Sequence, residues 1–329
     1  MNVNNKKFYW ITCMVLLLLI AGFSRCINSS RPVQSSADWC GKPLRPELKS
    51  LKEIKTKRKW FKVYSAGDGV YAIMEPYNYQ EVISYLILGQ DKALLFDTGM
   101  GLDTISLLVK ELTQLPITVL NSHTHYDHIG GNHEFAEILA MNTAFTVNNA
   151  ANGYRHQLVK QEVSPEAFCM ERLPDADTAT YKIKPFKISE LINDGYVIDL
   201  GGRKIDVIAV SGHTPDAIAL FDKQAKYLWT GDTFYQGPIW LFSEDTDLTA
   251  YEKSIAKLAA LANDQVKILP SHNIPVIPAN ELVVANQGFI QIMNGTKKGK
   301  PDGKKSILFD FGKFSFLIRK DLLQSQRKH

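Results

Sequence analysis

Residues 121–131, Asn-Ser-His-Thr-His-Tyr-Asp-His-Ile-Gly-Gly, constrain this chain more than any other segment. They place His123, His125, Asp127 and His128 within six residues. Three imidazoles and a carboxylate crowded together are costly to leave unpaired in a protein core. A divalent metal ion removes that cost, and neutral imidazole together with carboxylate is a ligand set that suits zinc. The segment therefore predicts a metal site.

Short apolar segments separated by Gly and Asp predict strands that alternate with helices. We expect strands near residues 70–74, 85–88, 93–96, 117–120, 143–147, 197–200, 204–210, 217–221, 227–230 and 266–269, with two more within 305–319, and helices at 103–115, 247–262 and 279–294. The histidine cluster follows the 117–120 strand directly. It therefore lies on a loop at the carboxyl end of a strand, where open α/β layers bind their ligands.

Three further segments repeat this arrangement, because His213, Asp232 and His272 each come just after a predicted strand. A single histidine after a strand is more often a hydrogen-bonding residue than a metal ligand. Repetition at several strand ends instead predicts nitrogen and oxygen ligands gathered at one rim. We predict one metal centre made of His123, His125, Asp127, His128, His213, Asp232 and His272.

The pattern His-x-His-x-Asp-His, followed in order by His213, Asp232 and His272, resembles the metallo-β-lactamase superfamily of dinuclear zinc hydrolases over about residues 60–320. The resemblance implies an α/β fold, namely an αββα sandwich of two mixed β-sheets flanked by helices, with the metals at one edge. It also implies two Zn²⁺ ions per chain. Metal 1 would be held by His123, His125 and His213, metal 2 by Asp127, His128 and His272, and both by a bridging Asp232.

The same resemblance assigns roles in catalysis. A metal-bound hydroxide would attack the substrate, and Asp127 would hold it in the attack direction. Asp97, in Asp97-Thr-Gly, is similar to an aspartate of the family that orients a metal ligand through a hydrogen bond. Tyr235 is placed like a tyrosine that holds the substrate carbonyl in acyl-homoserine lactonases, and packing in the core is its alternative role. Trp240 and Phe242 could extend an apolar wall beside Tyr235.

Two positions narrow the choice of chemistry within the superfamily. His125 stands where the di-iron, oxygen-reducing branch has Glu, which disfavours redox chemistry. Asp232 stands where the best-known β-lactamase class has Cys, and so resembles glyoxalase II, lactonases and related esterases. We therefore expect a zinc-dependent hydrolase that attacks an ester, lactone or thioester carbonyl. The alternatives are a β-lactamase, a phosphodiesterase and a zinc-binding protein without turnover.

Residues 1–26 have the organisation of an export signal. Lys6 and Lys7 precede an apolar run at 11–23 that is shorter than the roughly 20 residues of a spanning helix. Cys26 follows directly and leaves three interpretations open: a lipoprotein signal, a plain cleaved signal peptide or a retained membrane anchor. All three predict a protein that is exported and is periplasmic or attached to a membrane.

The rest of the chain divides into a linker at 27–59, a hydrolase domain at 60–320 and a C-terminal tail at 321–329. Within the domain, the polar segment 148–180 either covers the site or runs over the surface. Of the formal charge of +4, residues 1–25 contribute +3 through two lysines and Arg25 with no acid, so the remainder carries +1. A nearly neutral body argues against nucleic acid and for a small-molecule substrate. An exported protein could pair Cys40 with Cys169 in a disulfide.

Overall fold

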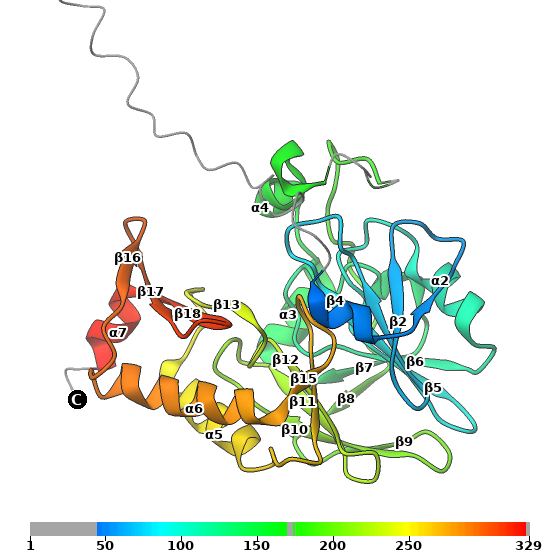
Figure 1. Ribbon diagram of the computed structural model, residues 1–329. Helices are drawn as coiled ribbons and strands as arrows, with labels where there is room; N and C mark the ends of the chain where they lie inside the picture. The colour runs from blue at the N-terminus through cyan, green and yellow to red at the C-terminus, as the bar shows by residue number, and fades with distance from the viewer. Residues whose placement is uncertain (1–44, 170–173, 175, 327–329) are drawn as a thin grey trace, which may run out of the picture.

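The computed structural model describes residues 45–169, 174 and 176–326 (Figure 1). The predicted export signal with Cys26, the first part of the predicted linker and the last three residues of the tail lie outside these ranges. Cys169 is described and is disulfide-bonded. Cys40, which the sequence suggested as its partner, lies outside the described ranges. No helix in the described part of the chain is both long and apolar enough to span a bilayer.

The first sheet has eight strands that follow one another in sequence order. Its first five strands pair antiparallel, and the last four, from β5 to β8, pair parallel. All four residues of β5 are buried, as expected for a strand covered on both faces. The strands are β1 (Glu53–Ile54), β2 (Lys62–Gly67), β3 (Val70–Met74), β4 (Ile83–Leu88), β5 (Ala93–Phe96), β6 (Ile117–Leu120), β7 (Ile138–Met141) and β8 (Glu190–Ile192).

A second sheet of six strands has the order β15-β14-β12-β11-β10-β9, and a smaller third sheet has the order β13-β18-β17-β16. The second sheet contains β9 (Val197–Asp199), β10 (Lys204–Ala209), β11 (Ile218–Asp222), β12 (Tyr227–Gly231), β14 (Lys267–Pro270) and β15 (Ile277–Pro278). The third contains β13 (Gly237–Leu241), β16 (Lys300–Asp302), β17 (Ser306–Asp310) and β18 (Phe314–Arg319).

The two large sheets pack face to face around one apolar core, in which Tyr85 and Phe96 of the first sheet meet Leu220 and Trp229 of the second. Helix α2 (Ile105–Leu112) packs on the outer face of the first sheet. Helices α5 (Leu248–Ala259) and α6 (Ala279–Met293) pack on the outer face of the second sheet, where they also contact the third (Figure 1). The layers are therefore helix, sheet, sheet, helix, and the predicted αββα sandwich is confirmed.

Shorter helices occupy the connections between these layers. They are η2 (Pro46–Ser50), η3 (Asn132–Glu134), α3 (Ala144–Asn152), α4 (His156–Val159), η4 (Lys160–Val163), η5 (Pro165–Ala167) and α7 (Lys320–Gln326). The strand predicted at 143–147 is wrong, because these residues begin α3. Thr143 caps the helix by accepting a hydrogen bond from the Thr146 backbone N–H at 3.0 Å. The strand of this region lies just before it, in β7.

Glu75 is buried beneath the loop that follows β5. Its carboxylate accepts hydrogen bonds from Trp60 Nε1 at 2.7 Å and from the Met100 backbone N–H at 2.8 Å. Burial raises the pKa of Glu75 to about 7, although both hydrogen bonds oppose the shift. The folded protein therefore holds a proton on Glu75 at pH values where the unfolded chain has released it.

This shift predicts a pH dependence of stability. Because the folded state binds more protons than the unfolded state above the usual pKa of 4.5, raising the pH toward 7 lowers the free energy of unfolding. The expected loss from Glu75 is roughly 3 kcal/mol. Glu75→Gln should remove this part of the dependence, measured by thermal melts between pH 5 and 8, whereas Glu47→Gln, at an exposed site, should keep it. Parallel profiles for Glu75→Gln and the unaltered protein would contradict the assignment.

Candidate metal centre

All seven predicted ligands lie on loops at one edge of the sandwich. The histidine-rich loop follows β6, which runs parallel to β5, and His272 follows β14, which runs parallel to β12. Strand β10 has the direction of β12 because both pair antiparallel with β11, so His213 and Asp232 leave their strands at the same edge. Backbone hydrogen bonds from Ile83 N–H to the Ser271 carbonyl and from Ile218 N–H to the Ser122 carbonyl, both 2.7 Å, join the sheets there.

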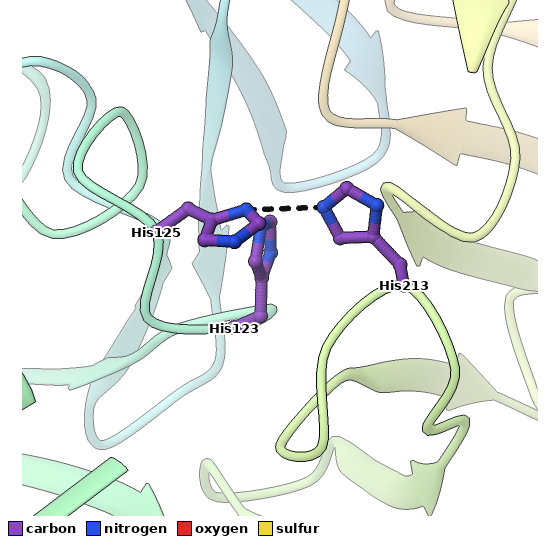
Figure 2. A group of neighbouring side chains, drawn as sticks. All are labelled: His123, His125 and His213. Carbon is purple, nitrogen blue, oxygen red and sulfur yellow. Dashed lines mark hydrogen bonds between the residues drawn. The ribbon is translucent and has the colours of Figure 1, made fainter. Parts of the chain in front are cut away.

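Three imidazoles form the first ligand group (Figure 2). His125 Nδ1 lies 2.9 Å from His123 Nε2 and 3.1 Å from His213 Nε2. Burial lowers the pKa of all three, and neighbouring imidazoles add to this effect for each of them. Neutral imidazole is the form that binds a metal ion, so this group suits one.

A second group combines Asp127, His128 and His272, and a third combines His123, His128 and Asp232. Within each group the ligand atoms lie no more than 4.8 Å apart. Asp232 Oδ1 is 3.2 Å from His272 Nε2 and 3.5 Å from His128 Nε2, whereas its Oδ2 is 3.6 Å from His213 Nε2. Asp232 therefore lies between the histidines assigned to the two metals, in the position expected of a bridging ligand.

Two orphaned polar atoms show that this cluster fits metal ions. His128 Nε2 and Asp232 Oδ1 are buried and make no hydrogen bond within the described residues, a cost that a bound cation would remove. Burial disfavours protonated His128, yet the carboxylates of Asp127, Asp97 and Asp232 together raise its pKa to about 10. A positive charge at this position is therefore stabilised by the surrounding carboxylates, and divalent ions would supply that charge.

In three of the histidines, the ring nitrogen that faces away from the site is held by a hydrogen bond. His213 Nδ1 donates to the Trp240 carbonyl at 2.8 Å, and His272 Nδ1 donates to the Gln80 carbonyl at 2.7 Å. His128 Nδ1 is 3.0 Å from Asp97 Oδ2. In the neutral imidazole, each contact leaves Nε2 without a proton and directed at the centre.

Asp97 connects the two sheets at this point. Besides contacting His128, its carboxylate accepts hydrogen bonds from the Ser122 backbone N–H at 2.7 Å and from Ser271 Oγ at 3.0 Å. Its φ of 67° lies in the left-handed region, which Asp tolerates better than most residues. The arrangement agrees with the orienting role that the sequence resemblance gave to Asp97.

Asp216 is a buried carboxylate that was not predicted from the sequence, and its hydrogen bonds connect the loops that carry the ligands. Its Oδ2 accepts hydrogen bonds from the backbone N–H and hydroxyl of Thr124, at 3.1 and 2.6 Å, and from the Thr146 hydroxyl at 3.0 Å. Its Oδ1 accepts from the Thr214 hydroxyl at 2.7 Å. Thr124 separates His123 from His125 and Thr214 follows His213, so Asp216 positions the whole first group.

The centre opens into a cavity of about 300 Å³. Tyr235, Trp240 and Phe242 line it, as the predicted apolar wall requires, and the last two rings lie 4.8 Å apart. The Tyr235 ring lies 4.9 Å from that of His272, but its hydroxyl donates to the Pro238 carbonyl at 2.6 Å. Its role in holding a substrate carbonyl therefore stays a prediction.

Five other lining residues were also missed: Tyr79, Gln80, Tyr126, Glu162 and Ser243. The sequence could have indicated Tyr126, because it stands between two predicted ligands of the histidine-rich segment. It could not have indicated Glu162, which is one of many polar residues in the segment 148–180. Through Glu162 on η4 this segment borders the cavity, and covering of the site by the whole segment stays a prediction. His133 and His156 do not line the cavity.

Replacing Asp216 tests its positioning role. In Asp216→Asn the amide nitrogen cannot accept the hydrogen bonds that reach the carboxylate, so the first ligand group loses its alignment. We expect zinc affinity to fall roughly 10- to 100-fold in a competition titration with a chelator. The matched control is Asp222→Asn, because Asp222 is a buried carboxylate at the far end of β11 that accepts from Arg203 Nε at 2.8 Å. The control should lose thermal stability and keep its zinc affinity; equal affinities in all three proteins would refute the role.

Comparison with known proteins agrees with this geometry. Human acyl-coenzyme A thioesterase MBLAC2 is 24% identical over 230 residues, which cover 65% of this chain and 81% of that protein. A hydroxyacylglutathione hydrolase from Yersinia enterocolitica is 24% identical over 264 residues, 76% of this chain and 87% of that protein. An archaeal metallo-beta-lactamase superfamily protein from Sulfolobus tokodaii shares the fold, with a TM-score of 0.51 and 15% identity over 79% of this chain and 99% of its own.

The chain also matches a protein family. Residues 81–272, more than half of the chain, match the family described as the Metallo-beta-lactamase superfamily. This span contains all seven side chains of the centre, together with Asp97. The chain belongs to the metallo-β-lactamase superfamily.

Proposed function

We propose that the protein is an exported hydrolase that uses two zinc ions to open an ester, lactone or thioester bond. The observation that carries the proposal is the convergence of seven side chains with nitrogen and oxygen donors, from four loops of two sheets, five of which line one cavity. Membership of a metallo-hydrolase superfamily, with a thioesterase and a hydroxyacylglutathione hydrolase among its relatives, supports hydrolysis. Export rests on the pattern of residues 1–26.

The donor sets suggest how two ions would be shared. His123, His125 and His213 would hold one, and Asp127, His128 and His272 the other, with Asp232 between them. Bound zinc lowers the pKa of a water molecule and polarises a carbonyl oxygen. Nitrogen and carboxylate donors without a thiolate fit a hydrolytic zinc centre.

The protein's own residues would orient the reactants. Asp127 is nearly buried and its Oδ2 lies 3.5 Å from His128 Nε2 and 3.7 Å from His272 Nε2, so its carboxylate can accept a hydrogen bond from the attacking water. This bond fixes the direction of attack. Trp240 and Phe242 would pack against the apolar part of the substrate and displace water from it.

We place acyl substrates ahead of β-lactams and phosphodiesters. One relative is an acyl-coenzyme A thioesterase and another a hydroxyacylglutathione hydrolase, and both act on acyl compounds by name. An initial-rate panel on the zinc-loaded full chain tests this order. It holds an acyl-homoserine lactone, a glutathione thioester, an aryl ester, a chromogenic cephalosporin and a bis-aryl phosphodiester. We expect a carbonyl substrate to reach a kcat/KM of about 10⁴ M⁻¹s⁻¹ or more. Turnover of the cephalosporin or phosphodiester alone would favour those alternatives.

Removing one ligand tests the centre itself. We expect His128→Ala to lose bound zinc and to lower kcat about 100-fold or more. The reason is that the ligand group with Asp127 and the group with Asp232 each lose one of their three donors. Metal analysis and rates on the best panel substrate provide the two measurements. His133→Ala is the matched control, since His133 lies five residues later and outside the cavity lining. Full zinc content and full activity in His128→Ala would refute the assignment.

A further inference from the structure

Glu162 brings a carboxylate to the cavity from outside the metal centre. The Tyr79 hydroxyl and Gln80 Nε2 both donate to its Oε2, the second at 3.0 Å. Gln80 Nε2 also donates to the Tyr126 hydroxyl at 2.9 Å. These contacts come from two different loops, β3–β4 and the histidine-rich loop, and they hold the carboxylate at a fixed place in the lining. Nothing in the proposed reaction uses it.

Among the described residues, Glu162 is the one carboxylate of the cavity lining that is not assigned to a metal ion. Asp127 and Asp232 are assigned to the metals, whereas Glu162 makes no ion pair among residues 45–169, 174 and 176–326. Within the same ranges, no Lys or Arg lines the cavity. A partly buried carboxylate without a basic partner attracts a cation and repels an anion.

An aromatic surface lines the same cavity. The Trp240 and Phe242 rings lie 4.8 Å apart at 46°, and Trp240 is 41% exposed, so part of this residue is accessible to a bound molecule. Aromatic faces attract ammonium groups within about 6 Å of the ring centre. A carboxylate and open aromatic rings in one cavity form a site for an organic cation that is too large and too apolar to be a metal ion.

We propose that the cavity selects substrates that carry a positively charged ammonium group, which Glu162 and the Trp240–Phe242 pair bind next to the reacting carbonyl. This inference rests on the proposed hydrolysis of a carbonyl compound at the metal centre. It assigns Glu162 as a specificity-determining residue. It also implies discrimination against thioesters with anionic leaving groups, because such groups would meet the Glu162 carboxylate, and no Lys or Arg of the described residues lines the cavity.

Three thioesters that differ in charge test the inference on the zinc-loaded full chain. They are acetylthiocholine, its uncharged isostere 3,3-dimethylbutyl thioacetate, and S-acetyl-3-mercaptopropionate, which is anionic. We expect kcat/KM to be highest for the cation and lowest for the anion, with about fivefold between cation and isostere, as for one partly exposed charge pair. Turnover of the isostere alone tests the proposed function, since this compound carries no charge.

Glu162→Gln removes the charge and keeps an oxygen that accepts from Tyr79. We expect it to abolish the preference for acetylthiocholine over the isostere, measured within each protein as the ratio of the two kcat/KM values. Glu166→Gln is the matched control, because Glu166 is an exposed acid four residues away on η5 and does not line the cavity. A preference that survives Glu162→Gln, or that Glu166→Gln removes equally, would overturn the inference while the hydrolase assignment stands.

A binding measurement tests the cation site even if the protein hydrolyses none of the three thioesters. Butyltrimethylammonium is not hydrolysed, and its N-methyl proton resonance broadens when it binds a protein. We expect zinc-loaded protein to broaden this resonance and Glu162→Gln to reduce the broadening about fivefold. Broadening without turnover would support the cation subsite and reject the proposed reaction on thioesters. Equal broadening by both proteins would overturn the inference whatever the rates.

Discussion

The docking of the two sheets at the metal edge is the constraint on which the rest of the structure depends. Neither sheet holds a complete ligand set, because the histidine-rich loop comes from the first sheet and His213, Asp232 and His272 come from the second. Main-chain hydrogen bonds and the Asp97 carboxylate join the sheets within the same few residues. The apolar core between the sheets sets their separation, and these polar contacts set their register.

The carboxylates at this edge have different surroundings and different roles. Asp97 and Asp216 are fully engaged by hydrogen bonds from hydroxyl and backbone groups, so they orient neighbouring residues. Asp232 retains an oxygen without a hydrogen bond and is therefore available to a cation. Glu162 is held by neutral donors at the cavity wall, where it can face a substrate. The environment of each acid, more than its identity, gives it its role.

The parts of the site that the sequence predicted are those with a local signal. The spacing within residues 123–128 and the placement of His213, Asp232 and His272 after apolar strands predicted side chains that the structure brings together. Asp216 and Glu162 could not be found this way, since their partners lie far along the chain: Thr124 is 92 residues from Asp216 and Tyr79 is 83 residues from Glu162. The strand expected at 143–147 failed for a related reason, because β-branched and aromatic residues favour a strand but Thr143 starts a helix by capping it.

Because the ligands come from both sheets, metal binding and closure of the sandwich are a single equilibrium. A partly opened edge, with the sheets apart, would retain at most the short-range ligands of the histidine-rich loop and would bind zinc weakly. Bound metal would therefore make closing of the sandwich more favourable, by a free energy that grows with the logarithm of the free metal concentration. The concentration of free metal would then determine both the occupancy of the site and the stability of the contact between the two sheets. At low zinc concentration the two sheets would separate more readily, and the protein would be degraded faster.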